Sequence, residues 1–454
     1  METDRPALPK YLHQPEGRTL EFKENCNNMQ GIIKSVIAFA NTAGGVLVVG
    51  VRDQTREIIG VEDPLAQEER LTSVISDSIA PLILPDIDIQ TVKNKELLVI
   101  TVPHTAGPFF LKSKGEEEGV YVRFGSTNRK ADGELLLSLR LVSRNRTFDE
   151  SPQPGGRIDE PTVEKTFKDA GRSWTEQSIA TLGIYTEHLG RKCATVGGTL
   201  LFDPDRLKFF PDSLIRCARF SGASKEHILD QRDIEAPLVQ SIDEALLFIE
   251  RNTRSAGRIG RMYRKDIPEY PKEALREALI NAIVHADYSM KGCHIQVAIF
   301  DDRIEFLSPG GLPFGQTMEK ALAGFSRLRN RVLGRAFREL RLIEQWGSGL
   351  QRILSLCRKR GLKAPDIAEF DQHFRVTLYS GAVSQRETYA WEEDLLPVLQ
   401  EKEAISTQSA AEIWGVSNRT ARTRLQKMVE GGTLYRVATS PRDPQAVYAR
   451  VSDV

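Results

Sequence analysis

In one stretch of the chain, a segment with the apolar periodicity of an α-helix comes directly before two strand-like segments. From Leu275 to Tyr288 apolar residues recur with a period of ~3.6, which predicts an amphipathic helix. The segments 294–300 and 303–307 that follow predict a β-hairpin. This order predicts helices packed on a sheet, and residues 156–272 are needed to complete such a domain.

Polar and glycine residues on this framework predict a site for phosphate groups. Glu277 and Asn281 are four residues apart and therefore lie on one face of the predicted helix. A sharp turn, 308–313, follows the hairpin, and Gly347 and Gly349 lie at the start of a further predicted helix. Unpaired backbone N–H groups and the helix dipole attract phosphate at such a start. Each feature alone is weak evidence, but the ordered set predicts a nucleotide site.

The ordered set resembles the GHKL ATPase fold. It is more similar still to the variant described as the carboxy-terminal part of RecG-related helicases, which L-R-E-A-L-I-N-A-I-V-H-A-D-Y-S and L-S-P-G-G-L-P match nearly residue for residue. The chain contains no G-x-x-x-x-G-K-[ST] phosphate loop, so the helicase label is misleading here. The resemblance implies an α/β sandwich that binds ATP with Mg²⁺, and it leaves open whether ATP is hydrolysed.

The resemblance also implies roles for individual residues. Glu277 would polarise the attacking water, and Asn281 would ligate Mg²⁺. Ser308 stands where the family has an adenine-reading aspartate, and a hydroxyl binds the adenine amino group less strongly than a carboxylate. The implied nucleotide-binding residues are Asn281, Ser308, Gly310, Gly311, Gly347, Ser348 and Gly349.

Two features of this region have alternative interpretations. The fold would also serve as a degenerate scaffold or dimerisation element without ATP. Arginines recur between Arg327 and Arg341, where a GHKL lid would cover the γ-phosphate. Arginine suits phosphate, but most such runs form solvated helix faces.

The first part of the chain predicts a mixed α+β domain. Residues 19–23 alternate between apolar and charged side chains, and apolar residues from Ile32 to Ala40 recur at helical spacing. Gly44 and Gly45 end that helix, and residues 46–51 predict a buried strand.

Four motifs of this part resemble the Schlafen AlbA-type domain over residues 10–135. They are E-G-R-T-L-E-F-K (16–23), A-F-A-N-T-A-G-G (38–45), V-G-V-R-D (49–53) and G-V-Y-V-R-F-G-S-T-N-R (119–129). The resemblance implies contact with DNA or RNA.

Some members of that family are metal-dependent ribonucleases with three carboxylates. The matching residues are Glu16, Glu21 and Asp53, which would hold Mg²⁺ or Mn²⁺. Lys23 would contact a phosphate. The alternative is structural: Glu21 and Lys23 would form a salt bridge, and Asp53 would cap a turn.

The last part of the chain predicts a helix-turn-helix. Residues 408–414 predict a short helix, Gly415 a tight turn, and Ser417 the cap of a second helix. Two strand-like segments, 433–437 and 446–450, follow as a β-wing. The whole resembles a winged-helix domain of bacterial regulators. DNA contacts are predicted for Asn418, Arg419, Arg422, Arg424 and Arg442, and a protein-interaction module is the alternative.

Composition sets the general class. Lys+Arg and Asp+Glu are both 62, so any basic surface must be local. Five scattered cysteines, the absence of a signal peptide and the absence of a long apolar run predict a cytoplasmic protein without a membrane partner.

Pro- and Gly-rich or small polar segments at 143–160 and 380–387 suggest linkers. We therefore expect an α+β multidomain chain with an AlbA-type domain (10–142), a GHKL-like domain (157–380, with its motifs in 271–380) and a winged helix (389–454).

These expectations lead to one main functional hypothesis and two rivals. The main hypothesis is an ATP-binding bacterial transcriptional regulator whose nucleotide state alters its engagement of DNA. The first rival is a metal-dependent Schlafen-type nuclease acting on structured RNA such as tRNA, or on DNA, and gated by the nucleotide domain. The second is an assembly scaffold with an inert nucleotide fold. Homo-oligomerisation stays open.

Overall fold

The computed structural model describes most of the chain. The described residues are 11–12, 14–52, 55–253, 255–259, 264–343, 349–370, 372–380, 391, 394–395, 398–401, 404–430, 434–437 and 447–450. Of the site residues named above, Asp53, Gly347, Ser348 and Arg442 lie outside them. The described residues up to 380 form one compact unit, and those from 391 onward form a second.

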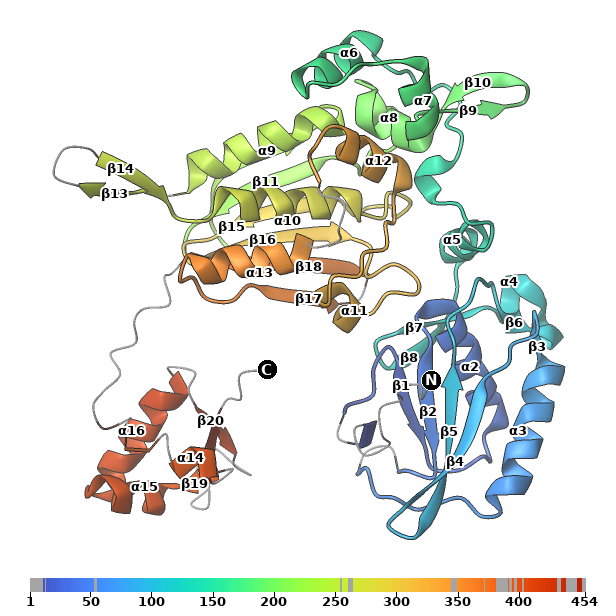
Figure 1. The fold of residues 1–454 in the computed structure, drawn as a ribbon, viewed down its shortest axis with the longest axis vertical. Helices are drawn as coiled ribbons and strands as arrows, with labels where there is room; N and C mark the ends of the chain where they lie inside the picture. Colours follow the sequence, from blue (N-terminus) through green and yellow to red (C-terminus); the bar gives the residue numbers. More distant parts are fainter. Residues whose placement is uncertain are drawn as a thin grey trace. The chain divides into compact units, whose positions relative to one another are not determined.

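The first region of the larger unit, blue to cyan in Figure 1, is built on a four-stranded sheet in the order β1-β2-β5-β4. Strands β1 and β2 are parallel, and the other neighbours are antiparallel. Its elements are β1 (Leu20–Lys23), α2 (Met29–Thr42), β2 (Gly45–Val49), α3 (Pro64–Ser78), β3 (Ile79–Ala80), β4 (Asp86–Val92), β5 (Lys95–Val102), β6 (Phe110–Leu111), α4 (Gly115–Gly119), β7 (Tyr121–Phe124), β8 (Thr127–Lys130) and α5 (Gly133–Ser143).

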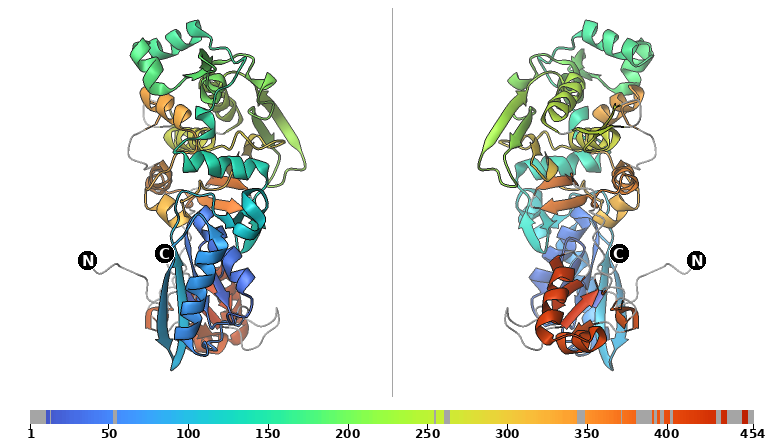
Figure 2. Two further views of the ribbon diagram at one scale, coloured as in Figure 1. Left: turned by 90° about the vertical axis from the view of Figure 1, so that its right-hand side faces the viewer. Right: turned by 90° about the vertical axis from the view of Figure 1, so that its left-hand side faces the viewer.

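The two faces of this sheet have separate cores. Helices α2 and α3 pack against the face that carries Leu47 and Ile100, and the opposite face buries Phe22 and Val48. Figure 2 shows the ribbon of this region from two further sides. Alternation of buried side chains along β2 and β5 produces both cores, as a pleated strand requires. The predicted helix and strands of this region are confirmed.

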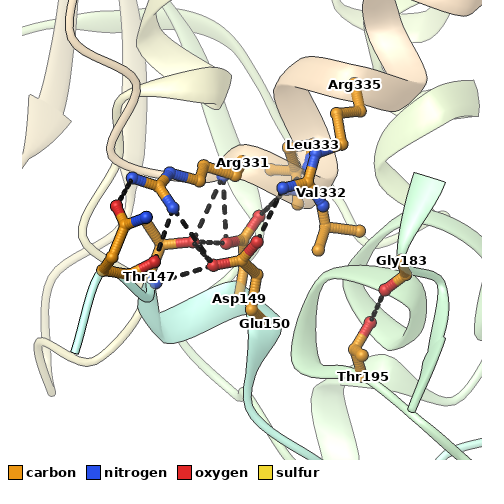
Figure 3. A network of polar contacts seen from close by, with 10 residues as sticks. Thr147, Asp149, Glu150, Gly183, Thr195, Arg331, Val332, Leu333 and Arg335 are labelled. Carbon is orange, nitrogen blue, oxygen red and sulfur yellow. Dashed lines mark hydrogen bonds and ion pairs between the residues drawn. The ribbon is translucent and has the colours of Figure 1, made fainter. Parts of the chain in front are cut away.

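The predicted linker at 143–160 is instead folded into the larger unit. It contains a 3₁₀ turn, η2 (Phe148–Glu150), and the Asp149 side chain is completely buried. Figure 3 shows the Asp149 carboxylate facing the first residues of α12 (Arg331–Glu339). The backbone N–H groups of Arg331, Val332 and Leu333 donate to this carboxylate at 3.0, 2.7 and 3.1 Å. The composition of the segment suggests a linker because its defined structure depends on contacts with residues ~180 positions away, which the local sequence does not reveal.

The second region carries a six-stranded sheet in the order β12-β11-β15-β16-β18-β17. Strands β11 and β15 are parallel, and the other neighbours are antiparallel. Its other elements are α6 (Glu160–Asp169), α7 (Glu176–Leu182), β9 (Tyr185–His188), β10 (Arg191–Ala194), α8 (Val196–Phe202), η3 (Arg206–Lys208), β11 (Ile215–Phe220), β12 (Ile228–Ile234), α9 (Leu238–Asn252), β13 (Ser255–Ile259), β14 (Arg264–Pro268), α10 (Lys272–Val284), β15 (Ile295–Ile299), β16 (Arg303–Pro309), α11 (Met318–Leu322), α13 (Gly349–Lys359), β17 (Asp366–Phe370) and β18 (His373–Tyr379).

Helices α9, α10 and α13 lie on one face of this sheet (Figure 1). The large core between the layers includes Leu279 and Ile283 of α10 and Val297 and Phe306 of the hairpin β15–β16. The predicted helix and hairpin are therefore confirmed. The sequence also predicts a strand at 214–220 and an amphipathic helix at 242–250, and β11 and α9 confirm both. The sequence of residues 198–202 also predicts a strand, and this prediction is wrong, because these residues belong to α8. All residues of α8 are buried and the Thr195 side chain caps its start, so no amphipathic period distinguished helix from strand.

The smaller unit consists of α14 (Val398–Glu401), β19 (Ala404–Ser406), α15 (Thr407–Trp414), α16 (Asn418–Glu430), β20 (Leu434–Val437) and β21 (Val447–Arg450). Gly415 joins α15 and α16 in the left-handed conformation, at φ 59°, which glycine adopts without strain. The three strands form an antiparallel sheet in the order β19-β21-β20. Strand β19 had not been predicted.

The chain is therefore an α+β multidomain protein, as predicted. Within the described part of the chain, no helix combines the length and apolar character that a membrane span requires.

Candidate nucleotide site

Glu277 and Asn281 lie on the same face of α10 and line one cavity. Leu275, Leu279 and Ile283 of the same helix are buried in the core, so the amphipathic period sets which side chains reach the cavity. The cavity has a volume of about 240 Å³. The predicted positions Ser308, Gly310, Gly311 and Gly349 line it as well, so six of the candidate residues converge there.

The turn after β16 needs glycine at Gly310. This residue has φ +87°, and a Cβ built there would lie 2.7 Å from the Asp287 Cβ. A Cβ at Gly311 would lie 2.2 Å from Glu369 Oε1. The backbone of the turn therefore approaches its neighbours more closely than any side chain would permit.

The start of α13 approaches α10 directly. A Cβ built at Gly349 would lie 2.5 Å from Glu277 Oε1 and 3.0 Å from Asn281 Nδ2. The convergence predicted from the sequence, between the polar face of one helix and the glycine start of another, is present at this residue. The adjoining Gly347 and Ser348 lie outside the described residues.

The remaining walls of the cavity carry both apolar and polar side chains. Phe306, Phe374 and Val376 contribute apolar side chains from the sheet, and Ser308, 2 % exposed, contributes a hydroxyl among them. The polar and charged residues of the lining include Glu277, Asn281, Arg327, Arg338 and Arg352. An apolar wall with one hydroxyl suits a purine base, while an amide, arginines and a glycine start suit phosphates and Mg²⁺. The lining thus fits ATP with Mg²⁺.

Arg329 holds the turn 308–313 to the end of α10. Its guanidinium donates to the carbonyl oxygen of His285 at 3.0 Å, to Asp287 Oδ2 at 2.9 Å and to the carbonyl oxygen of Gly311 at 2.5 Å. Arg18, from the first region, donates to the carbonyl oxygen of Leu312 at 2.9 Å. Sequence reasoning missed both roles, because nothing local distinguishes these arginines from solvated ones.

His285 also lines the cavity, and burial together with the charge of Arg329 lowers its pKa to about 4. Its ordinary pKa is 6.5, so the unfolded chain takes up a proton first as pH falls. We expect the free energy of unfolding to drop by about 2 kcal/mol between pH 6.5 and pH 4 through this residue, with allowance for its partial exposure. Urea unfolding of the native chain and of His285→Gln at both pH values tests this. An equal pH dependence in the two proteins would contradict it.

The second predicted site centres on Glu21, which is 4 % exposed. Glu21 Oε2 accepts a hydrogen bond from Arg123 Nη1 at 2.6 Å, and Lys23 Nζ lies 2.5 Å from Glu21 Oε1. Each oxygen of the Glu21 carboxylate is therefore paired with a cationic side chain. The pair with Lys23 is the salt bridge that the structural alternative predicted. Burial lowers the pKa of Arg123, and the nearby carboxylates of Glu21 and Glu16 counteract this.

Glu16 lies near the same strand. Its Oε1 accepts a hydrogen bond from the backbone N–H of Phe22 at 2.7 Å. Across the described residues, which exclude Asp53, no group of three His, Cys, Asp or Glu side chains is arranged to hold a metal ion. The pairing of Glu21 favours a structural role, and the carboxylate triad stays a prediction. Incubation of tRNA and duplex DNA with Mn²⁺ and Glu16→Gln tests it, because Glu21 substitutions would also break the buried ion pair.

The predicted DNA-contacting residues of the smaller unit differ in exposure. Asn418, Arg419 and Arg422 are exposed on the first turns of α16. The Arg424 guanidinium carbon instead lies 5.1 Å from the ring centroid of Trp391 and 5.5 Å from that of Trp414. Arg424 therefore takes part in packing as well.

Two segments of the chain match known domain families. Residues 16–132 match the family described as "Schlafen, AlbA_2", and residues 292–378 match the family described as "Putative ATP-dependent DNA helicase recG C-terminal". The two matched domains are those that the sequence motifs predicted.

Among individual proteins, the chain is similar to one named "Uncharacterized ATP-binding protein" from Ureaplasma parvum, at 25 % identity over 151 residues. That match covers 31 % of this chain and 42 % of the relative, so the chain spans about two fifths of the length of the curated relative.

Two solved structures are also similar. The DIP2311 protein from Corynebacterium diphtheriae has 21 % identity and a TM-score of 0.44, with 95 % of this chain and 92 % of that chain covered. The N-terminal domain of a RecG-related protein from Nitrosomonas europaea has 26 % identity and a TM-score of 0.22, with 27 % and 92 % covered.

Proposed function

We propose that this chain is a bacterial regulator that binds ATP with Mg²⁺ and engages nucleic acid in a nucleotide-dependent manner. The observation that carries the proposal is the convergence of Glu277, Asn281, Ser308 and Gly349 on one cavity. The name of the Ureaplasma parvum relative also supports ATP as the ligand. DNA would bind through the smaller unit as a winged helix, and DNA or RNA through the AlbA_2 domain.

The proposed chemistry assigns a task to each group of lining residues. Ser308 would hydrogen-bond the base between the apolar side chains of the sheet, and the start of α13 would receive the phosphates. Bound Mg²⁺ would neutralise phosphate charge, with Asn281 as the protein ligand. Glu277 would orient and deprotonate a water molecule, as hydrolysis requires.

Nucleotide dependence is motivated by contacts of the turn 308–313 with the AlbA_2 domain. Arg18 of that domain forms an ion pair with Glu369, and the Leu312 N–H donates to Glu369 Oε1 at 2.8 Å. The Gly315 N–H donates to the carbonyl oxygen of Thr42 at 2.6 Å. A ligand that shifts this turn would alter contacts of the nucleic-acid domain, and allosteric coupling requires such differential contacts.

The experiment that tests the coupling measures DNA affinity with and without saturating ATP·Mg²⁺. We expect a change of at least about fivefold, the low end of ordinary allosteric coupling. Equal affinities in the two conditions would exclude nucleotide-dependent engagement. Calorimetry without DNA separates this result from a failure to bind ATP at all, which would instead favour the scaffold hypothesis.

The two polar residues of α10 are expected to respond differently to substitution. Asn281→Ala should weaken binding of ATP·Mg²⁺ at least about tenfold, because a metal ligand is lost. Glu277→Gln should leave binding within about threefold of the native chain but abolish any hydrolysis, because an amide accepts no proton. Calorimetry and a phosphate-release assay give the two readouts. Equal loss of binding in both variants would contradict the assigned roles.

A further inference from the structure

A second cavity, next to the candidate nucleotide site, is lined by arginines. It has a volume of about 410 Å³ and lies between residues 138–148 and the segment 326–338. We call it the arginine cavity. The arginines that line it are Arg146, Arg327, Arg329, Arg331, Arg335 and Arg338. Asp287 is the one carboxylate among the lining residues that the structure describes.

The nearby carboxylates are already committed to other partners. Asp287 pairs with Arg329 at 2.9 Å. Glu150 pairs with Arg335 at 2.8 Å, as Figure 3 shows. Asp149 is buried against the backbone N–H groups of α12. By contrast, the side chains of Arg146, Arg327 and Arg338 form no hydrogen bond or ion pair with any residue that the structure describes.

The cavity therefore has an excess of positive charge that the chain does not neutralise. Burial and the charge of Arg331 lower the pKa of Arg327, as expected for a cation held near another cation. Keeping several guanidinium groups together without anions is unfavourable, and an anionic ligand would remove that cost.

We propose that the arginine cavity binds a segment of single-stranded nucleic acid. Guanidinium groups form paired hydrogen bonds with phosphate oxygens, which supplies the attraction to the backbone. Phe148 and Phe314 also line the cavity, and aromatic side chains beside arginines stack on unpaired bases. A duplex keeps its bases stacked inside and would use the arginines alone, so the aromatic lining favours a single strand.

This ligand is distinct from the nucleotide of the neighbouring cavity. Pro313, Arg327, Leu328 and Arg338 line both cavities, whereas Arg146 lines the arginine cavity and not the candidate nucleotide site. Arg146 is exposed, so its replacement should not unfold the chain. Binding at this cavity goes beyond the proposed function, and it is tested without ATP because Arg327 and Arg338 line both cavities.

The test compares Arg146→Gln with Arg251→Gln in the full chain without nucleotide. Arg251 is exposed on α9, far in sequence from the cavity lining, and its loss changes the net charge equally. Fluorescence anisotropy measures affinity for a uridine oligonucleotide, a thymidine oligonucleotide and a duplex of equal length. We expect Arg146→Gln to weaken single-strand binding at least about fivefold and to lower the salt slope by ~1, with little change in Arg251→Gln.

A second measurement locates the bound oligonucleotide on the chain, because the AlbA_2 domain and the smaller unit are also proposed to bind nucleic acid. Ultraviolet crosslinking of a 4-thiouridine oligonucleotide should yield peptides that contain Phe148 or Phe314. The proposal is overturned if crosslinks occur only in residues 14–132 and 398–450, or if Arg146→Gln and Arg251→Gln bind single strands equally. It is also overturned if Arg146→Gln weakens duplex binding as much as single-strand binding, or if polyglutamate competes as well as the oligonucleotides do.

Discussion

Replacing Glu21 with alanine is expected to destabilise the AlbA_2 domain by about 3–5 kcal/mol, because it leaves a buried guanidinium without its carboxylate. The Arg123 side chain is 1 % exposed, and Glu21 Oε2 lies 2.6 Å from its Nη1. Arg123 also donates to the carbonyl oxygens of Gly17 and Leu20, so it cannot move to solvent without losing further hydrogen bonds. Hydrogen exchange of peptides from β1 and β7 in the full chain measures the loss.

Two further variants separate the ion pair from other effects. Glu24→Ala removes an exposed carboxylate of the same segment, 3.5 Å from Arg52, and should change stability by less than about 1 kcal/mol. The double variant Glu21→Leu with Arg123→Met should recover most of the stability, because neither buried charge remains. If Glu21→Ala exchanges as slowly as the native chain, Glu21 is not a structural partner of Arg123.

Replacing Asp149 with alanine is expected to destabilise the second region of the larger unit, which contains α12, by about 3–4 kcal/mol. This carboxylate accepts hydrogen bonds from three backbone N–H groups of α12, and the buried N–H groups of Val332 and Leu333 would lose this acceptor. Burial raises the pKa of Asp149 to about 6, so the group is mainly ionised at neutral pH and is suited to a helix start. Hydrogen exchange of α12 peptides measures the change.

Asp132→Ala is the control, because the exposed Asp132 carboxylate also accepts a backbone N–H at a helix start, that of Leu135 in α5. It should cost only about 1 kcal/mol. Asp149→Ala should also weaken ATP binding, because Asn330 immediately before α12 donates at 2.8 Å to the carbonyl oxygens of Val284 and Ala286 at the end of α10. Equal effects of the two substitutions on α12 would contradict the buried role of Asp149.

The helix α10 and the hairpin β15–β16 could be predicted from the sequence because each has one buried and one less buried face. Apolar residues then recur every ~3.6 positions in the helix and every second position in the strands, and this spacing is visible in the sequence. Helix α8 could not be predicted, since it is buried on every side and its residues carry no repeat.

The sequence by itself determined which chemical groups would meet at the candidate nucleotide site. Glu277 and Asn281 share a face by helical spacing, and Gly310 and Gly349 occupy positions where a side chain would collide with neighbouring groups. Only the tertiary structure decided the electrostatic partners of the other groups. Arg123 is 102 residues from Glu21, and Arg331 is 182 residues from Asp149. Such pairs cannot be predicted from local periodicity, because the partner of each carboxylate comes from a segment that is distant in the sequence and adjacent only in the folded chain.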